Sequence, residues 1–136
     1  MIFVDTSAFY AMHVGTCEEH RTAVEIRDKI AAGQFGSMVT TNYVLDELAT
    51  LLRIRVGHEA AVEVGEAIRS SASVEIVWVS PKLEGSAWDL FKKREDSDFS
   101  FTDCTSFIVM KSRRMTRAFA FDRHFSQMGF ETVPVE

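Results

Sequence analysis

The chain opens with the sequence Met1-Ile-Phe-Val-Asp-Thr-Ser-Ala-Phe-Tyr-Ala-Met12. Ile2 to Asp5 has the composition of a short buried strand that ends in an acid. Thr6 or Ser7 is then expected to cap a short helix, since hydroxyl side chains are favoured at helix N-termini. A buried strand followed directly by a helix is the first part of a strand–helix–strand unit, so these residues predict a parallel α/β sheet.

The same alternation of apolar runs and helical patterns continues over the rest of the chain. Helices are predicted at 17–32, 42–55, 58–70, 81–94 and 102–114, with a short helical turn at 123–128. Further strands are predicted at 38–41, 74–79, 118–121 and 131–134. Gly33, Gly57 and Gly129 mark helix ends, and Asn42 is predicted to cap the helix that it begins.

Strands that alternate with helices favour one parallel sheet covered on both faces. We predict a single three-layer α/β/α domain over residues 1–136, with a mainly parallel five-stranded sheet in the order 3-2-1-4-5. No internal repeat, low-complexity stretch or linker indicates a second domain. In this order, the strands that precede Asp5 and Asp122 are neighbours where the strand order reverses, which is where such sheets bind ligands.

The composition is that of an ordinary globular domain, with 46% hydrophobic and 26% charged residues. No apolar stretch approaches the roughly 18 residues of a membrane helix, and the apolar start lacks the basic leader of a signal peptide. We therefore expect a cytoplasmic protein that does not span a membrane. Cys17 and Cys104 lack metal-type spacing and are expected to be small buried side chains without a disulfide.

The net charge of −5 disfavours a general polyanion binder. Two basic groups are nevertheless a weak indication of RNA or DNA binding, although solvated helix faces are the more ordinary explanation. The groups are Lys92, Lys93 and Arg94, and Lys111, Arg113, Arg114, Arg117 and Arg123. Five aromatic residues are interpreted as core or interface positions rather than as base-stacking platforms. They are Trp78, Trp88, Phe91, Phe99 and Phe101.

Four carboxylates, at positions where apolar segments meet turns or on the apolar side of a helix, are the candidate site. They are Asp5, Glu47, Asp103 and Asp122. Each also has a simpler explanation as a helix cap, a surface residue, a member of a capping box or a turn residue. Carboxylates gathered in one pocket repel one another and lose hydration, so such a cluster needs a cation or shared protons.

Two of these acids are predicted to lean inward from their helices. At about 100° per residue, Glu47 falls on the same apolar arc as Ile54, whereas Asp46 falls on the polar face and is expected at the surface. Asp103 stands in a first turn that resembles a capping box, and it shares its face with Phe107. Hard oxygen ligands suit Mg²⁺ or Mn²⁺, which also accept phosphate oxygens and activate water. The set therefore predicts metal-dependent phosphoryl chemistry on a nucleic acid.

Other sequence motifs give weaker indications of function than the four acids. The chain has no Gly-x-x-x-x-Gly-Lys phosphate loop, no Gly-x-Gly-x-x-Gly turn and no Gly-x-Ser-x-Gly elbow. The histidines are expected to be structural or solvated, and His124, just after Asp122, is the one that we single out as a candidate member of the site. A phospho-acceptor or phosphatase with Asp5 as nucleophile is an alternative, although no second acid follows two residues on. A catalytically silent module, whose basic C-terminal third docks RNA or a partner, is another.

Four segments together resemble the PIN-domain family in order and spacing, over nearly the whole chain. They are Val4-Asp5-Thr6-Ser7, Asn42-Tyr-Val-Leu-Asp-Glu47-Leu, Ser100-Phe-Thr-Asp103-Cys and Ala120-Phe-Asp122-Arg-His-Phe125. The likeness is greatest to the stand-alone VapC-type toxins of toxin–antitoxin pairs. It implies a Mg²⁺- or Mn²⁺-dependent, single-strand-preferring endoribonuclease that forms a homodimer and is inhibited by a small antitoxin.

The resemblance also implies roles for individual residues. Asp5 and Asp103 would be the principal metal ligands, and Glu47 and Asp122 would complete the catalytic site directly or through water. Supporting polar roles fall to Thr6, Ser7 and Asn42. Phe121 departs from the pattern, because many relatives have Thr or Ser there, and this puts one hydroxyl contact in doubt. Whether Asp98 or His124 contributes is left open.

Overall fold

A five-stranded parallel sheet forms the centre of the protein in a computed structural model that describes residues 1–135. The strands are β1 (Ile2–Val4), β2 (Met38–Thr41), β3 (Val74–Val77), β4 (Arg117–Phe119) and β5 (Glu131–Val133). Their order is β3-β2-β1-β4-β5, and every neighbouring pair is parallel. The predicted fold class and strand order are confirmed. Residue 136 of the predicted domain lies outside the described residues.

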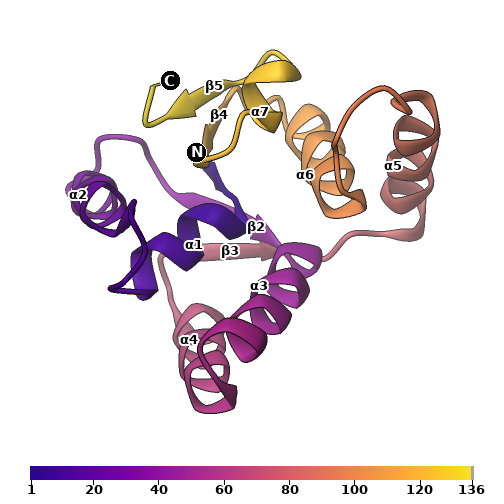
Figure 1. Cartoon of the computed structure of the whole chain (residues 1–136). Helices are drawn as coiled ribbons and strands as arrows, with labels where there is room; N and C mark the ends of the chain where they lie inside the picture. The colour runs from indigo at the N-terminus through magenta and orange to yellow at the C-terminus, as the bar shows by residue number, and fades with distance from the viewer. Residues whose placement is uncertain (136) are drawn as a thin grey trace.

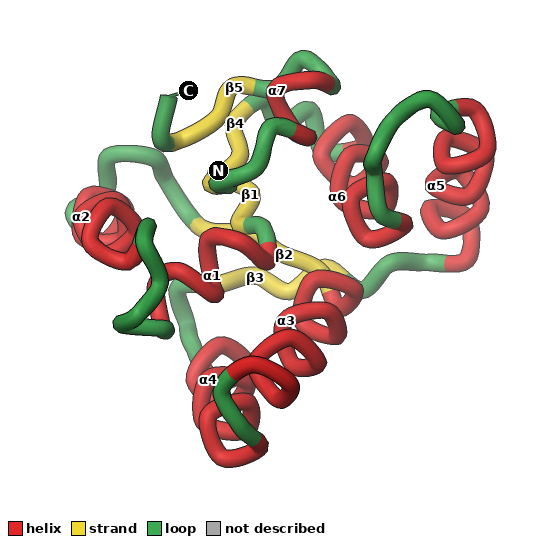
Figure 2. The backbone as a smooth tube through the Cα atoms, viewed as in Figure 1, coloured by secondary structure: helices red, strands yellow, loops and turns green. Residues whose placement is uncertain are grey.

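Helices flank this sheet (Figure 1). They are α1 (Thr6–His13), α2 (His20–Ala31), α3 (Asn42–Arg55), α4 (His58–Ser70), α5 (Pro81–Lys93), α6 (Phe101–Ser112) and α7 (His124–Gln127). Helix α5 packs against α6 and α3 packs against α4, and Figure 2 shows the two pairs at different corners of the sheet. No helix in the described residues has the length and apolar character needed to cross a bilayer.

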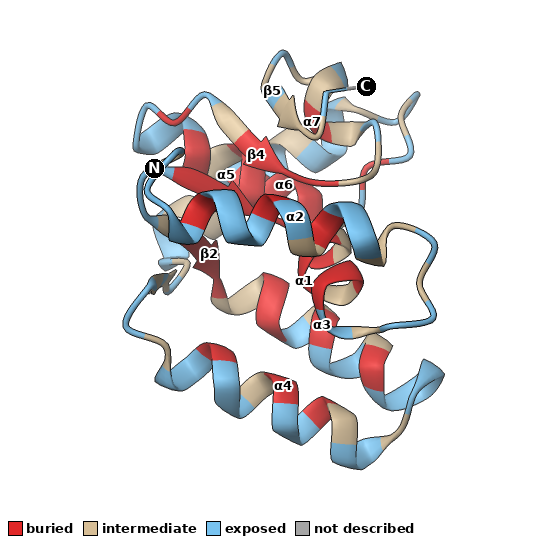
Figure 3. Cartoon of the chain, turned by 90° about the vertical axis from the view of Figure 1, so that its left-hand side faces the viewer, coloured by how far each residue is buried: buried red, intermediate tan, exposed pale blue. Residues whose placement is uncertain are grey.

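The core is centred on β1, α1 and α6. All three residues of β1 are fully buried, and Phe9 and Met12 of α1 are nearly so. Helices α2 and α4 instead bury one face and expose the other (Figure 3). Helix α6 buries seven of its residues, including the polar Asp103 and Ser106. Because polar groups are buried only where something satisfies them, the start of α6 is a candidate functional region.

Strand pairing places the first and last predicted acids at one edge of the sheet. Val4 is paired with Phe119 in the parallel β1–β4 ladder, and the backbone N–H of Asp5 donates to the Phe119 carbonyl at 3.0 Å. Asp122 follows β4 after two further residues. The carboxyl ends of β1 and β4 therefore meet where the strand order reverses, as the sequence predicts.

Two predicted helix caps are wrong. Asp5, rather than Thr6 or Ser7, caps α1, because its extended backbone lets its side chain accept from the Ser7 N–H. Thr41, rather than Asn42, caps α3, and its hydroxyl accepts from a backbone N–H in the first turn at 3.1 Å. The Asn42 side chain accepts instead from the Val79 N–H at 2.8 Å. Strand β3 ends at Val77 and not at 79 as predicted, because its partner β2 ends at Thr41, which is paired with Val77.

Other predicted boundaries shift by a few residues. Helix α2 begins at His20 and not at 17, and the imidazole Nδ1 of His20 lies 2.7 Å from the Ala11 carbonyl. Strand β4 spans 117–119 rather than 118–121. Ile54 was placed on the apolar arc of its helix but is 78% exposed, because the last turn of α3 extends beyond the core.

Candidate metal centre

Asp5 is the most deeply buried acid of the candidate site, with 2% of its surface exposed. Its Oδ2 accepts from the Ser7 hydroxyl at 2.7 Å and from the Ser7 N–H at 3.2 Å, whereas Oδ1 is buried without a hydrogen-bond partner. Burial, followed by repulsion from Asp122 and then Asp103, raises the pKa of Asp5 to about 8. The free oxygen and the raised pKa describe a carboxylate that needs a proton or a cation.

Ser7 links the two strand ends that form the site. While its hydroxyl donates to Asp5, its oxygen accepts from the backbone N–H of Phe121 at 3.0 Å. Phe121 has no side-chain hydroxyl to offer, but its backbone makes this connection between the segments after β1 and β4. Thr6, the other predicted supporting hydroxyl, is buried, and its Oγ1 has no hydrogen-bond partner.

Asp103 is held at the start of α6 by the predicted capping box. Its Oδ2 accepts from the Ser100 N–H at 3.0 Å, and its own N–H donates to the Ser100 hydroxyl at 3.0 Å. Burial raises the pKa of Asp103, repulsion from Asp122 and Glu47 adds to this, and the Ser100 N–H and His124 oppose it. The simple explanation as a cap is therefore correct but incomplete, because the capping carboxylate also faces other acids.

Asp122 and His124 complete a compact group with Asp103. Within the described residues, these three side chains offer ligand atoms that all lie within 4.8 Å of one another. His124 Nδ1 is 2.7 Å from Asp103 Oδ2 and 3.8 Å from Asp122 Oδ1, although its ring N–H is not aligned for a hydrogen bond. Asp122 Oδ1 also accepts from the His124 backbone N–H at 3.0 Å.

Glu47 approaches this group from α3. It is half-buried, whereas its neighbour Asp46 is exposed, as the helical pattern predicts. Its charge contributes to the raised pKa of Asp103, so the two carboxylates lie within electrostatic range. The structure thus brings all four predicted acids within electrostatic range at one edge of the sheet, and Asp103 and Asp122 lie in one compact group with His124.

His124 is the residue that sequence reasoning left unassigned. Only its position two residues after Asp122 pointed to it, and its partner Asp103 is distant in the sequence. Its ring is also packed edge-on against Phe99 at 5.5 Å, which fixes its position beside the acids. Asp98, the other open candidate, is exposed and lines a separate groove with Phe99. The Asn42 side chain accepts a hydrogen bond from the Val79 N–H and has no hydrogen bond to an acid among the described residues.

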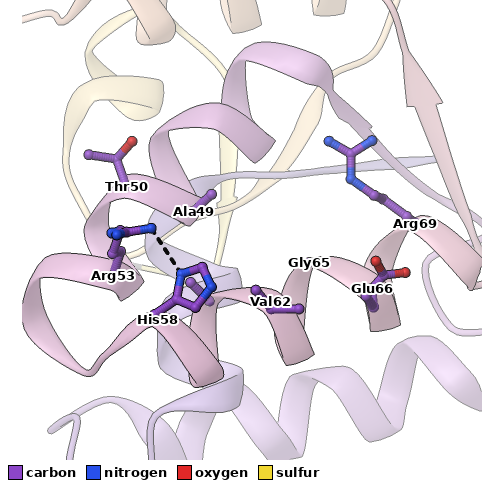
Figure 4. Close-up of a pocket in the computed structure, with 9 residues that line it drawn as sticks. Ala49, Thr50, Arg53, His58, Val62, Gly65, Glu66 and Arg69 are labelled. Atoms are coloured by element: carbon purple, nitrogen blue, oxygen red, sulfur yellow. Dashed lines mark hydrogen bonds between the residues drawn. The ribbon is translucent and has the colours of Figure 1, made fainter.

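A groove between α3 and α4 lies outside this centre (Figure 4). Its lining is mostly small or apolar, with Arg53 and Arg69 at its two ends, and the guanidinium of Arg53 lies 2.9 Å from His58 Nδ1. None of the four candidate acids lines it. The groove therefore has no part in the metal chemistry that the acids indicate.

The chain belongs to the PIN-domain family, whose model matches residues 2–131. It is 40% identical to a protein named 23S rRNA-specific endonuclease VapC20 from Mycobacterium tuberculosis, over the whole length of both chains. It is also 27% identical to a VapC ribonuclease from Archaeoglobus fulgidus, over 90% of this chain and 78% of that one. The crystal structure of M. tuberculosis VapC20, described as a sarcin–ricin loop cleaving toxin, matches with a TM-score of 0.86 and 38% identity over 96% of both chains.

We expect the metal-free protein to lose thermal stability as the pH rises from about 4 to 8. The pKa of Asp5 is 3.8 in an unfolded chain and about 8 in the fold, so the fold binds this proton more tightly. Protonated Asp5 therefore contributes fully to the stability of the fold below the unfolded-state pKa, and this contribution is lost as the pH rises through the folded-state pKa. Unfolding curves in chelator at constant ionic strength measure this, and Asp5→Asn should flatten the dependence. Equal pH profiles for the two proteins would contradict it.

Proposed function

We propose that this protein is a metal-dependent endoribonuclease that acts as the toxin of a type II toxin–antitoxin pair. The observation that carries the proposal is the buried Asp5 carboxylate, with one unpartnered oxygen, in the field of Asp122 and Asp103. Charged groups are buried together only where a proton or a cation compensates them. The likeness to relatives named as endonuclease and ribonuclease supports RNA as the substrate.

The donor set fits Mg²⁺ or Mn²⁺, because these hard cations take carboxylate oxygens and retain water. Asp5 and Asp103 would be the principal ligands, and Asp122 and Glu47 would complete the site directly or through water. When bound, the ion would activate a water and neutralise charge that develops on the phosphate. Imidazole is a poorer ligand for these ions, so we assign His124 an electrostatic role beside Asp103, with its Nδ1 2.7 Å from Asp103 Oδ2.

The protein's own groups hold the acids in place for this chemistry. Ser7 fixes one oxygen of Asp5 and leaves the other free, and the Ser100 N–H fixes Asp103 in the same manner. In the reaction, a water oxygen bonds to phosphorus as the bond to one ester oxygen breaks, and that oxygen leaves with a proton. No covalent bond to the enzyme is needed, so each acid can remain in its hydrogen-bonded position throughout.

The alternative of a silent module that docks RNA through its basic C-terminal third has less support. Arg113 is paired with Glu75 at 2.8 Å, and Arg117 is paired with Glu131 at 3.2 Å. Arg117 begins β4, so these cations lie toward the amino edge of the sheet, opposite the acids. A phospho-acceptor is also less supported, because the chain belongs to the PIN-domain family and has no second acid two residues after Asp5.

The oligomeric state, the inhibitor and the cellular location are further proposals. We infer a homodimer, inhibition by a small antitoxin and residence in the cytoplasm, where a toxin would meet its RNA. The name of the M. tuberculosis relative specifies 23S rRNA. An RNA containing the sarcin–ricin loop therefore belongs in any substrate panel for this protein, beside unstructured single strands.

We expect cleavage of at least one RNA of such a panel in Mg²⁺ or Mn²⁺ and none in chelator. Glu47→Gln should lower the rate about 10- to 100-fold, because it removes one charge from the acid group but keeps its shape. Mapping of cleavage ends on a denaturing gel measures both. Asp46→Asn, the adjacent exposed acid, is the matched control and should cleave normally. Metal-independent cleavage, or equal loss in the two variants, would overturn the assignment.

A further inference from the structure

Three aromatic rings form a platform on α5 and the start of α6. Trp88 and Phe91 of α5 stack on one another, with ring centroids 5.6 Å apart and an interplanar angle of 25°. Phe101 packs edge-on against both, at 5.8 and 5.9 Å. Trp88 is 50% exposed and Phe91 is 38% exposed. These two residues, interpreted from the sequence as core or interface positions, are not core positions: α5 buries only Ala87, so its rings remain on the surface.

The platform adjoins the acid group through two routes. Phe101 packs edge-on against Tyr43 of α3 at 5.9 Å. This ring pair joins the two helices that carry Asp103 and Glu47, each within about one turn of its ring. In Figure 1, α5 lies on the outer side of α6. The rings of Trp88 and Phe91 contact Phe101 of α6 and remain partly exposed to solvent.

The second route is a groove that leads from the platform to the ring beside His124. Trp88 and Phe91 line this groove together with Phe99, which packs against His124. The guanidinium of Arg94 lies 5.1 Å above the Phe99 ring. Phe99 therefore lies between this groove and His124, and the groove is the place that we assign to a nucleotide next to a phosphate at the acids.

The charges of the groove select the kind of ligand. Its lining has two cations, Lys92 and Arg94, and two acids, Glu95 and Asp98, so they cancel. A phosphate would gain little electrostatic binding energy here, because the charges of the groove cancel. An apolar protein surface would bury these charged side chains, which costs free energy. A nucleobase is uncharged, offers a flat face to the rings, and carries polar edges that the acids and Ser97 can bind.

We propose that Trp88 and Phe91 stack a base of single-stranded RNA next to the phosphodiester held by the acids. This inference rests on the proposed function for the identity of the strand. Stacking on aromatic side chains tolerates every base, so the platform would position RNA without specifying its sequence. Trp88, Phe91 and Phe101 would then be positioning residues, and none of them touches the reacting phosphate.

Fluorescence of Trp88 tests this directly. In Trp78→Phe, Trp88 is the one remaining tryptophan of the two in the chain. Combined with Asp5→Asn, which keeps the RNA intact, this protein should show quenching when oligoadenylate is added. An oligomer of equal length and charge without bases should not quench. Trp88→Ala should weaken oligoadenylate binding about 5- to 100-fold, as expected for the loss of one stacked base. Trp88→Phe should retain most of it.

Val62→Ala is the matched control, because Val62 is 48% exposed in the separate α3–α4 groove and should leave binding unchanged. Equal quenching by the two oligomers, or binding unaffected by Trp88→Ala, would overturn the proposal. So would dissociation of a dimer in Trp88→Ala by sedimentation, because the platform would then be a contact between copies. Base-dependent quenching without cleavage of any RNA by the unmodified protein would overturn the proposed function and leave this inference standing.

Discussion

Asp5→Asn is expected to abolish RNA cleavage while making the metal-free protein more stable at pH 8. The carboxylate is buried, and burial with neighbouring acids raises its pKa to about 8. The neutral amide removes this repulsion, so the melting temperature in chelator should rise by several degrees. Loss of a metal ligand removes several kcal/mol of charge stabilisation in the transition state, which corresponds to a rate about a thousandfold lower.

The two effects of this substitution must be measured on one preparation, by thermal unfolding in chelator and by cleavage of a labelled RNA in Mg²⁺ or Mn²⁺. The amide oxygen can still accept from Ser7, and its NH₂ group takes the place of the unpartnered Oδ1. The fold should therefore be retained. Asp46→Asn changes neither property, because Asp46 is exposed. A stable Asp5→Asn protein that cleaves at the normal rate would show that Asp5 is only a helix cap.

A stability gain linked to an activity loss would identify the acid group as a region where function opposes folding. Sites that hold charge for a ligand are destabilising until that ligand binds. Added Mg²⁺ or Mn²⁺ should accordingly stabilise the unmodified protein and leave Asp5→Asn nearly unaffected. If Asp5 served only as the N-cap of α1, added metal would have the same effect on the stability of both proteins, since Asp and Asn are equally good N-cap residues.

The sheet and the meeting of Asp5 with Asp122 were predictable because they depend on local patterns. Short apolar runs between helical segments locate the strands, the order 3-2-1-4-5 is the one that the PIN-domain resemblance implies, and parallel strands end at one edge. The helical period likewise separated Glu47 from Asp46. Apart from the strand order, these inferences use only the spacing of residues along one element and the rules for connecting elements.

The parts that sequence did not predict depend on contacts between distant segments. His124 meets Asp103, and the Ser7 hydroxyl meets the Phe121 N–H, across long loops. Asn42 was expected to cap a helix, but its amide oxygen is taken by Val79. The exposure of Trp88 was missed for a related reason, because α5 is separated from the sheet by α6 and buries little of its own surface.

Phe107→Ala is expected to lower the free energy of unfolding by about 3–5 kcal/mol, the range for a fully buried ring replaced by a methyl group. Phe107 is 0% exposed. Its ring packs edge-on against Phe99 at 5.0 Å and Phe125 at 5.1 Å, and stacks with Phe130 at 5.9 Å. Denaturant unfolding in chelator measures the loss.

This substitution should also weaken the metal centre, because Phe107 lies one helical turn from Asp103 and supports Phe99, which packs against His124. We expect the cleavage rate of Phe107→Ala to fall even at temperatures where the protein remains folded. Phe91→Ala is the matched control for stability, since its ring is 38% exposed and its loss should cost far less. A loss of less than about 1 kcal/mol in Phe107→Ala would mean that the aromatic core can collapse around the cavity, and that it does not fix the start of α6.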